Sequence, residues 1–276
     1  MELDKIIDQI AARVPADDDT YTGKDGLLYC SRCNTPRQTR IQILERESVV
    51  PCLCQCMNEA LNAEEEERKR LERVAQLNKY RALGFDNSIM QDWTFANDDR
   101  ANATLTSAMK AYVENFPKLR KSGKGLLLWG DVGSGKTYYA ACIVNALIDR
   151  GYPCLMTNFA RLTNQISATW SDKQEYIDSL NRFALVAIDD LGVERDTEYM
   201  NETVTTIIDS LYRAGVPMII TSNHTPKNLT DETDIRKRRV YDRLLERCMP
   251  VKVDRVSRRL ETGRRDYAEM RKLLGL

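Results

Sequence analysis

Residues 125–137 read Gly-Leu-Leu-Leu-Trp-Gly-Asp-Val-Gly-Ser-Gly-Lys-Thr, and this stretch decides the fold of the chain. It fits the phosphate-binding pattern G-x-x-x-x-G-K-[ST] at every fixed position. The run from Leu126 to Trp129 is short and apolar, which is typical of a buried parallel strand. After Lys136 the apolar residues recur at helical spacing. A strand, a glycine-rich loop and a helix in this order predict a site whose backbone N–H groups surround phosphates.

Two side chains of this loop are expected to have separate tasks. Lys136 is expected to reach the β- and γ-phosphates of ATP, and Thr137 to hold Mg²⁺ through its hydroxyl. A chance glycine-rich turn is disfavoured, because the strand and helix that the motif requires are both present. The expected nucleotide-binding set comprises Gly130, Asp131, Val132, Gly133, Ser134, Gly135, Lys136, Thr137 and Tyr138.

An acidic pair follows another apolar run of the chain. Residues 184–188 lead directly into Asp189 and Asp190, which is the Walker B pattern. Asp189 is expected to hold the Mg²⁺ shell, and Asp190 to polarise the attacking water. Glu194 is a second candidate for positioning that water.

Further apolar runs at 153–158, 216–223 and 251–253 predict three more strands. The run at 216–223 ends in Thr-Ser-Asn, and a polar side chain there could touch the γ-phosphate or the water. Helical stretches separate the runs, which predicts an α/β fold with a doubly wound parallel sheet and a ligand at its carboxyl edge. Residues 100–121 are expected to form one helix. Ahead of it, Trp93 and Phe95 either flank an adenine ring or pack beneath the sheet.

Five of the eight cysteines fall within residues 30–56. Cys30-x-x-Cys33 is followed, after an 18-residue spacer, by Cys52-x-Cys54-x-Cys56. Four thiolates suit a tetrahedral zinc, and an all-cysteine site leaves no open position for catalysis, so the zinc would be structural. One of the last three cysteines is then spare, and the spacing does not say which. A redox-active pair is disfavoured, because it would not need the second cluster.

The organisation around these motifs predicts two parts. Residues 2–14 have helical apolar spacing and form a helix that packs on its own protein or docks a partner. A charged connecting helix spans 57–82. We expect an N-terminal region, 1–83, with helix, zinc module and connecting helix, and an ATPase domain, 84–276. About 20 residues follow the last strand, too few for a multi-helix lid.

Composition limits the partners and the compartment. The formal net charge is zero, so a nucleic-acid site must be a local patch. Arginine-rich segments at 235–247 and 255–265 are candidates for such phosphate contacts, or are solvated basic faces. No apolar run approaches the roughly 20 residues that cross a bilayer, and no signal peptide is visible. These features and the cysteine usage predict a reducing cytoplasm and no membrane partner.

These motifs resemble the AAA+ ATPases of the replicative-helicase loader (DnaC-like) and IstB-like group, over residues ~85–260. The cysteine module resembles the one in loader-like proteins of phages and Firmicutes. The resemblance implies a P-loop AAA+ sheet with a reduced C-terminal lid. It also implies that Asn223 is the sensor-1 residue, that Arg239 or Arg243 is the arginine finger or its neighbour, and that Arg258 or Arg259 is a sensor-2-like contact. Asp190 departs from the pattern, since many relatives carry glutamate there.

By this resemblance the chain is expected to load a hexameric replicative DNA helicase onto single-stranded DNA, using ATP, Mg²⁺ and Zn²⁺. It would self-associate through its AAA+ domains and hydrolyse ATP slowly unless assembled. Two alternatives stay open. One is an IstB-like transposition helper that recruits a transposase on duplex DNA. The other is a nucleotide-gated adaptor with little hydrolysis.

Overall fold

The computed structural model describes residues 19–43, 46–98, 102–168, 172–192, 198–254, 267 and 270–275. The chain divides into two compact units, Met1–Ala75 and Gln76–Leu276. The domain boundary expected after residue 83 stays a prediction. The helix predicted at 2–14 lies outside the described residues, as does most of the segment in which a reduced lid was expected.

The first unit is built from two small antiparallel hairpins. β1 (Thr20–Thr22) pairs with β2 (Leu28–Cys30), and β3 (Gln38–Ile43) pairs with β4 (Arg46–Pro51). Among the described residues of this unit, Cys30 and Cys54 alone are buried. This unit therefore has no apolar core in the part that the structure describes.

Helix α2 (Gln55–Gly84) follows the hairpins and covers the range expected for the connecting helix. Ion pairs at helical spacing support it, such as Lys69 with Glu65 at 2.7 Å. Its apolar stripe is thin and exposed, including Leu61, Leu71 and Val74. Such a helix is stabilised by charge pairs more than by burial.

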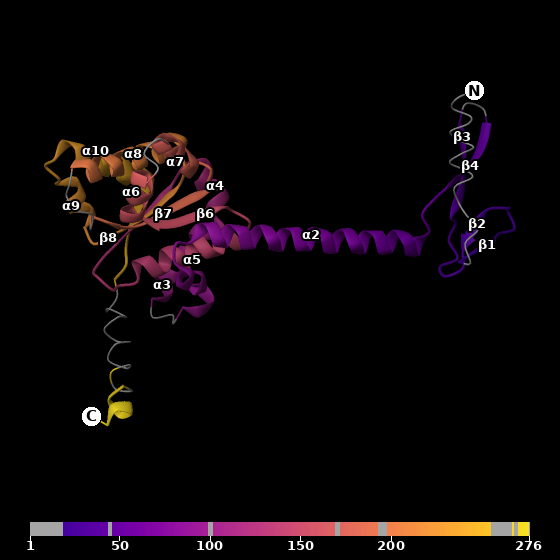
Figure 1. Ribbon diagram of the computed structural model, residues 1–276, viewed down its shortest axis with the longest axis horizontal. Coiled ribbons are helices and arrows are strands. Elements are labelled where there is room, and N and C mark those ends of the chain that lie inside the picture. The colour runs from indigo at the N-terminus through magenta and orange to yellow at the C-terminus, as the bar shows by residue number, and fades with distance from the viewer. Residues whose placement is uncertain are drawn as a thin grey trace. The chain divides into compact units, whose positions relative to one another are not determined.

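The second unit contains a five-stranded parallel sheet in the order β6-β7-β8-β5-β9. Figure 1 labels β6, β7 and β8 of this sheet, with helices around them. The strand before the glycine-rich loop, β5, lies between β8 and β9. All five strands match the apolar runs in the sequence, although β9 begins three residues earlier than expected. Their bounds are β5 (Gly125–Trp129), β6 (Cys154–Asn158), β7 (Leu185–Leu191), β8 (Met218–Ser222) and β9 (Cys248–Lys252).

Helices cover both faces of this sheet. Leu126 and Leu128 of β5 belong to the core cluster shared with α3 and α5, whereas Leu127 belongs to the cluster on the opposite face. Burial on both faces explains why the strand is an uninterrupted apolar run. The helices are α3 (Ala103–Glu114), α4 (Phe116–Lys121), α5 (Lys136–Asp149), α6 (Phe159–Ala168), α7 (Lys173–Leu180), α8 (Glu198–Ala214), α9 (Pro226–Thr230) and α10 (Ile235–Arg247), with short 3₁₀ turns at η1 (Ser88–Asp92) and η2 (Phe95–Asn97).

The single helix expected at 100–121 is wrong. The chain forms α3 and α4, which meet at Asn115. Pro117 causes the break, because it has no N–H to donate and its ring clashes with the carbonyl four residues earlier in a continuing helix. Pro117 instead occupies the first turn of α4, where no helical hydrogen bond is lost.

At each edge of the sheet, a feature reduces the number of free backbone hydrogen-bonding groups. On β9 the N–H of Val253 donates to Trp129 O at 2.7 Å, so alternate residues face β5 and Pro250 faces the open edge. At the other edge, β6 forms a bridge between Met156 and Phe85. Within the described part of the chain, no helix has the length and apolarity that a membrane span requires.

Candidate nucleotide site and cysteine cluster

The loop between β5 and α5 takes its shape from three glycines at positive φ: Gly130 (150°), Gly133 (81°) and Gly135 (100°). A Cβ on Gly130 would lie 2.4 Å from the carbonyl oxygen of Val253, so only glycine fits there. Gly135 is the N-cap of α5, whose free N–H groups therefore open onto the loop. The loop has the backbone geometry of an anion-binding site.

Two polar side chains are buried inside this loop. Lys136 is 6% exposed, and its Nζ donates to Gly130 O at 2.9 Å and to Asp131 O at 2.8 Å. Ser134 is 1% exposed, and its Oγ has no hydrogen-bond partner among the described residues. A buried ammonium beside an unpartnered hydroxyl fits a phosphate, which would supply both a counter-charge and an acceptor.

Thr137 and Asp189 lie side by side, although 52 residues separate them in sequence. The Thr137 hydroxyl is 3.0 Å from both carboxylate oxygens of Asp189. The pKa of Asp189 is raised above its usual value, chiefly by burial and also by the charge of Asp190, although hydrogen bonds from Thr221 and Thr137 and the charge of Lys136 oppose this shift. A hydroxyl and a carboxylate next to a phosphate loop form the hard oxygen donor set that Mg²⁺ prefers.

The other expected catalytic residues lie around this pair. Asp190 is exposed and follows Asp189 on β7. Asn223 is exposed and comes directly after β8. Thr221 is one of the polar residues that end the run at 216–223, and its hydroxyl contacts Asp189 at 2.5 Å, a partner that the sequence did not indicate. The feature of the sequence that could have indicated this contact is a hydroxyl residue at the end of the strand that neighbours the acidic strand. Glu194, Arg258 and Arg259 lie outside the described residues.

The two candidate arginine fingers differ in their surroundings. Arg243 forms an ion pair with Asp209 of α8 and stacks over the ring of Tyr212 at 5.8 Å. Arg239, one turn earlier on α10, is exposed and makes no hydrogen bond or ion pair within the described part of the chain. Arg239 is therefore free to reach a second molecule, whereas Arg243 is used within its own chain.

The segment ahead of α3 is fastened to α5. Tyr138 donates its hydroxyl to Thr94 O at 2.9 Å. The Asn145 side chain donates to Met90 O and Trp93 O, both at 2.9 Å. Trp93 packs against the core and its ring lies 6.1 Å from that of Tyr138, so the packing interpretation of this aromatic fits the structure.

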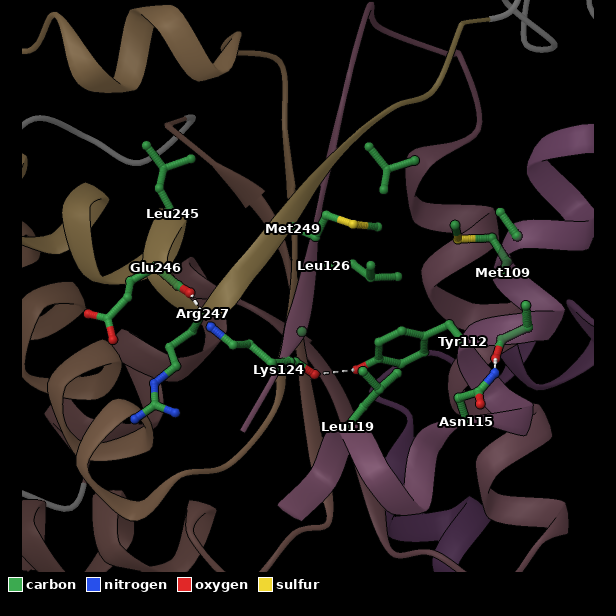
Figure 2. A pocket seen from close by; sticks show the side chains of 14 residues that line it. Met109, Tyr112, Asn115, Leu119, Lys124, Leu126, Leu245, Glu246, Arg247 and Met249 are labelled. Carbon is green, nitrogen blue, oxygen red and sulfur yellow. Dashed lines mark hydrogen bonds between the residues drawn. The ribbon is translucent and has the colours of Figure 1, made fainter. Parts of the chain in front are cut away.

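A separate cavity of about 570 Å³ lies at the opposite end of β5 from the phosphate loop. Figure 2 shows Met109 and Tyr112 of α3 facing Met249 of β9 across it. Tyr112 donates to Lys124 O at 3.0 Å, and Lys124 Nζ donates to Glu246 O at 2.8 Å. Both bonds join residues that line this mostly apolar space, which is not part of the nucleotide site.

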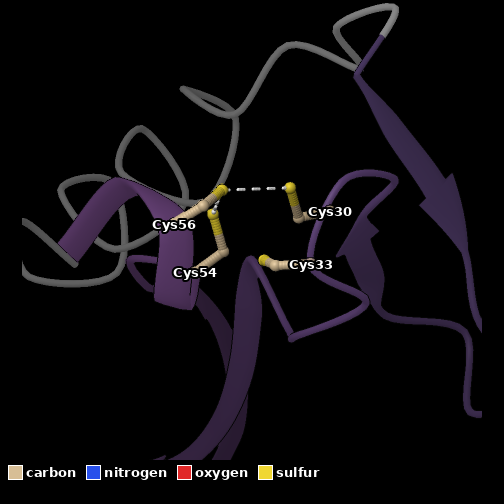
Figure 3. A group of neighbouring side chains, drawn as sticks. All are labelled: Cys30, Cys33, Cys54 and Cys56. Atoms are coloured by element: carbon tan, nitrogen blue, oxygen red, sulfur yellow. Dashed lines mark hydrogen bonds between the residues drawn. The ribbon is translucent and has the colours of Figure 1, made fainter. Parts of the chain in front are cut away.

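Four cysteines converge in the first unit: Cys30, Cys33, Cys54 and Cys56, whose sulfurs all lie within 4.8 Å of one another (Figure 3). Cys52 is not in this group, because its Sγ donates to Pro36 O at 3.4 Å. Of the five clustered cysteines, Cys52 is therefore the one whose sulfur lies outside the four-sulfur group.

The backbone and the thiols of this cluster suit a metal. Asn34 follows Cys33 at φ 54°, and its N–H returns to Cys30 O at 2.9 Å, which forms the tight turn that a C-x-x-C pair needs. A hydrogen bond with Thr35 lowers the pKa of Cys33 to about 5, whereas bonds to the other thiols raise the pKa of Cys56 to about 12. Four sulfurs at this spacing fit a tetrahedral zinc.

Comparison with known proteins gives a consistent picture. The family model for IstB-like ATP binding proteins matches residues 51–266. The replicative helicase loader DnaI of Bacillus subtilis is 24% identical over 204 residues, which cover 68% of this chain and 66% of that protein. An ATP-binding protein of an insertion sequence in Mycobacterium tuberculosis is 26% identical over 169 residues, covering 59% of this chain and 64% of that protein. The chain thus spans slightly less than two thirds of these relatives. The crystal structure of DnaI superposes with a TM-score of 0.54 at 20% identity, covering 65% of this chain and 99% of that one, which shows a shared fold.

Proposed function

The chain belongs to the family of IstB-like ATP binding proteins, and we propose that it is an ATPase of this family that loads a hexameric replicative DNA helicase onto single-stranded DNA. Membership supports ATP binding and ATPase activity in general. The loader role is our proposal, supported by the similarity to the loader DnaI. The observation that carries the ATPase part is the Thr137 hydroxyl 3.0 Å from both oxygens of Asp189, beside the buried Lys136.

In this proposal the chain's residues divide the work on ATP. The loop amides and Lys136 hold the phosphates, while Thr137 and Asp189 hold Mg²⁺, which supplies charge neutralisation at the transferring phosphoryl group. Asp190 polarises the water and Asn223 contacts the γ-phosphate or the water. Because Asp190 is one methylene shorter than glutamate, it places water less well, which suits a slow, switch-like ATPase.

Hydrolysis then depends on assembly. The ATPase domains associate side by side, and Arg239 reaches the ATP of the neighbouring subunit. Its exposure and lack of a partner in the described residues favour it over Arg243, which pairs with Asp209. A finger supplied by another molecule raises hydrolysis by roughly 10³–10⁵. An isolated subunit should therefore turn over very slowly.

The N-terminal region is proposed to grip the helicase. Its four-cysteine cluster is a closed set of sulfur ligands, so zinc there would hold a docking surface in shape and not act in catalysis. ATP would then order the complex on single-stranded DNA, and hydrolysis would release it.

A second candidate is a transposition helper that assembles on duplex DNA. The family description and the similarity to an ATP-binding protein of an insertion sequence favour it. This candidate shares the ATP site and differs in its partner, so activity on ATP alone does not separate the two.

Light scattering separates them. The protein is mixed with the replicative helicase of the same genome, with and without ATP, and compared with a chain lacking residues 1–83. A discrete complex that requires residues 1–83 supports the loader. Absence of a complex, together with ATP-dependent growth of particles on duplex DNA, overturns it in favour of the transposition helper.

A further inference from the structure

A β-bulge interrupts the pairing of β7 with β8 at the acidic pair. Ile188 is opposite Ile220, and Leu191 is opposite Ser222, so three steps on β7 match two steps on β8. Asp189 and Asp190 therefore share the position of one residue on β8, which is Thr221. Bulges break the inside–outside alternation of a strand and redirect its side chains, and they recur next to active sites.

The bulge forces Asp190 into a costly conformation. Its φ is +61°, in the left-handed region that side-chain-bearing residues adopt rarely. A bulge also removes a ladder partner from the extra residue, and a peptide N–H without a partner is costly. Something other than the β8 backbone must therefore hold Asp190 in place.

The Thr221 hydroxyl does this from the opposite strand. It accepts the N–H of Asp190 at 2.9 Å and donates its own proton to Asp189 Oδ1 at 2.5 Å. Thr221 is 1% exposed, so water does not compete for either bond. One hydroxyl thus links the backbone of the second acid to the carboxylate of the first.

The neighbouring hydroxyl fixes the far end of the same bulge. Ser222 Oγ donates to Leu191 O at 2.8 Å and accepts the N–H of His224 at 3.1 Å. It contacts neither acid in the described structure. The two hydroxyls therefore have different tasks, and only that of Thr221 reaches the acidic pair.

We propose that Thr221 is a positioning residue, whose hydroxyl pins the bulge and thereby aims Asp189 at the metal and Asp190 at the water. This inference rests on the proposed ATPase function and deepens it. The hydroxyl of Thr221 hydrogen-bonds to the acidic pair, whereas the buried ammonium of Lys136 hydrogen-bonds to the loop carbonyls. Loss of the hydroxyl should therefore impair metal-dependent steps while leaving nucleotide capture by the loop.

The test compares Thr221→Val, which keeps the shape and removes the hydroxyl, with Thr221→Ser, which keeps the hydroxyl. Thr157→Val is the matched control, because Thr157 lies in the same sheet, is 6% exposed, and has an Oγ1 without a hydrogen-bond partner in the described structure. A fluorescent ATP analogue measures affinity with Mg²⁺ and with EDTA, and phosphate release measures hydrolysis. Thr221→Ala serves as a second hydroxyl-free variant if Thr221→Val does not fold.

We expect Thr221→Val to bind the analogue in EDTA as the wild type does. It should lose roughly 10- to 100-fold in hydrolysis and need more Mg²⁺ for half-maximal binding. Thr221→Ser should restore both, and Thr157→Val should match the wild type. Unchanged Mg²⁺ dependence in Thr221→Val, or failure of Thr221→Ser to rescue, overturns the inference in an otherwise active protein. A wild type that binds no ATP overturns the ATPase proposal itself.

Discussion

Asn34 beside the cysteine cluster and Asp190 beside the phosphate loop are the two non-glycine residues at positive φ in the described chain. Each occupies a tight feature that positions ligands, and each is a residue type that tolerates the left-handed region better than most. Their support differs. Asp190 lies in a strand whose residues 185–188 are fully buried, whereas Asn34 lies in a unit whose described residues include two buried side chains, both cysteines.

This difference shows two ways of holding a site in place. The nucleotide site is imposed by a hydrophobic core that exists without any ligand. The cysteine site has too little apolar burial to offset the conformational entropy of its loops, so we expect a metal to supply the stabilisation. We therefore expect the fold to form the nucleotide site without a ligand, and a metal at the cysteine site to stabilise the fold around it.

Removal of the metal tests this contrast with the largest expected effect. Structural zinc contributes about 10–16 kcal/mol in zinc-finger peptides. A strong chelator, added without nucleotide, should abolish hydrogen-exchange protection in residues 19–54 and leave the five-stranded sheet protected. Protection of residues 19–54 that survives complete metal removal would show that the hairpins fold by themselves.

The ATP site should depend on a second subunit, and Arg239→Ala tests this. We expect a loss of roughly 10³-fold or more in assembly-stimulated hydrolysis, with ATP affinity kept. Arg243→Ala should instead lower the melting temperature, because it breaks the pair with Asp209.

Mixing variants sharpens this prediction. Arg239→Ala retains a nucleotide site but lacks the finger, and Lys136→Ala has the finger but lacks the lysine. Equal amounts of the two should recover part of the activity, because some interfaces then contain both groups. No recovery, in a mixture shown to co-assemble, would contradict a finger supplied by the neighbour.

Lys136→Ala alone should lower ATP affinity by roughly 100-fold, because charge-assisted hydrogen bonds to phosphate are lost. The cysteine unit should keep its metal, as measured by zinc content. Lys124→Ala is the control, because Lys124 directly precedes β5, at the end of that strand away from the loop, and its ammonium bonds to Glu246 O. Equal losses in both variants would mean that the effect is not specific to the loop.

Asp190→Gly should separate stability from activity. Glycine accepts φ +61° without strain, so the free energy of unfolding should rise by up to about 1 kcal/mol in urea, while hydrolysis falls. A clear loss of stability would show that the carboxylate contributes more than its backbone strain costs.

Cys52→Ser should have the smallest effect. The Cys52 thiol lies outside the four-sulfur group, so zinc content and the fold should stay unchanged. Cys54→Ser removes one of the four sulfurs and should reproduce the chelator result. Loss of zinc from Cys52→Ser would place the spare cysteine elsewhere.

The sequence predicted the sheet because its signals are local. The loop motif and the apolar runs each predict their own conformation from consecutive residues. Because β5 is buried on both faces, the run from Leu126 to Trp129 is apolar throughout and predicts a strand without knowledge of the neighbouring strands. The acidic pair within β7 was predicted in the same way, from the apolar run that precedes it. The break at Asn115 was missed, although Pro117 was visible, because the flanking residues suit a helix on both sides.

Features that depend on register could not be found this way. The bulge exists only in the offset between two strands, so nothing within residues 184–190 indicates that Thr221 would stand opposite both acids. The spare cysteine is a similar case. Cys52, Cys54 and Cys56 are equivalent by spacing, and only the path of the chain past Pro36 turns one of them away.

Pro250 on the outer strand has a consequence for how molecules of this protein can associate. A parallel sheet with free edges is a template on which further strands can add without limit. Here β9 lacks a donor in the middle of its open side, and β6 is already bridged at Met156 by Phe85. If the ATPase domains associate as proposed, we expect them to do so through side-chain contacts and not through shared backbone ladders.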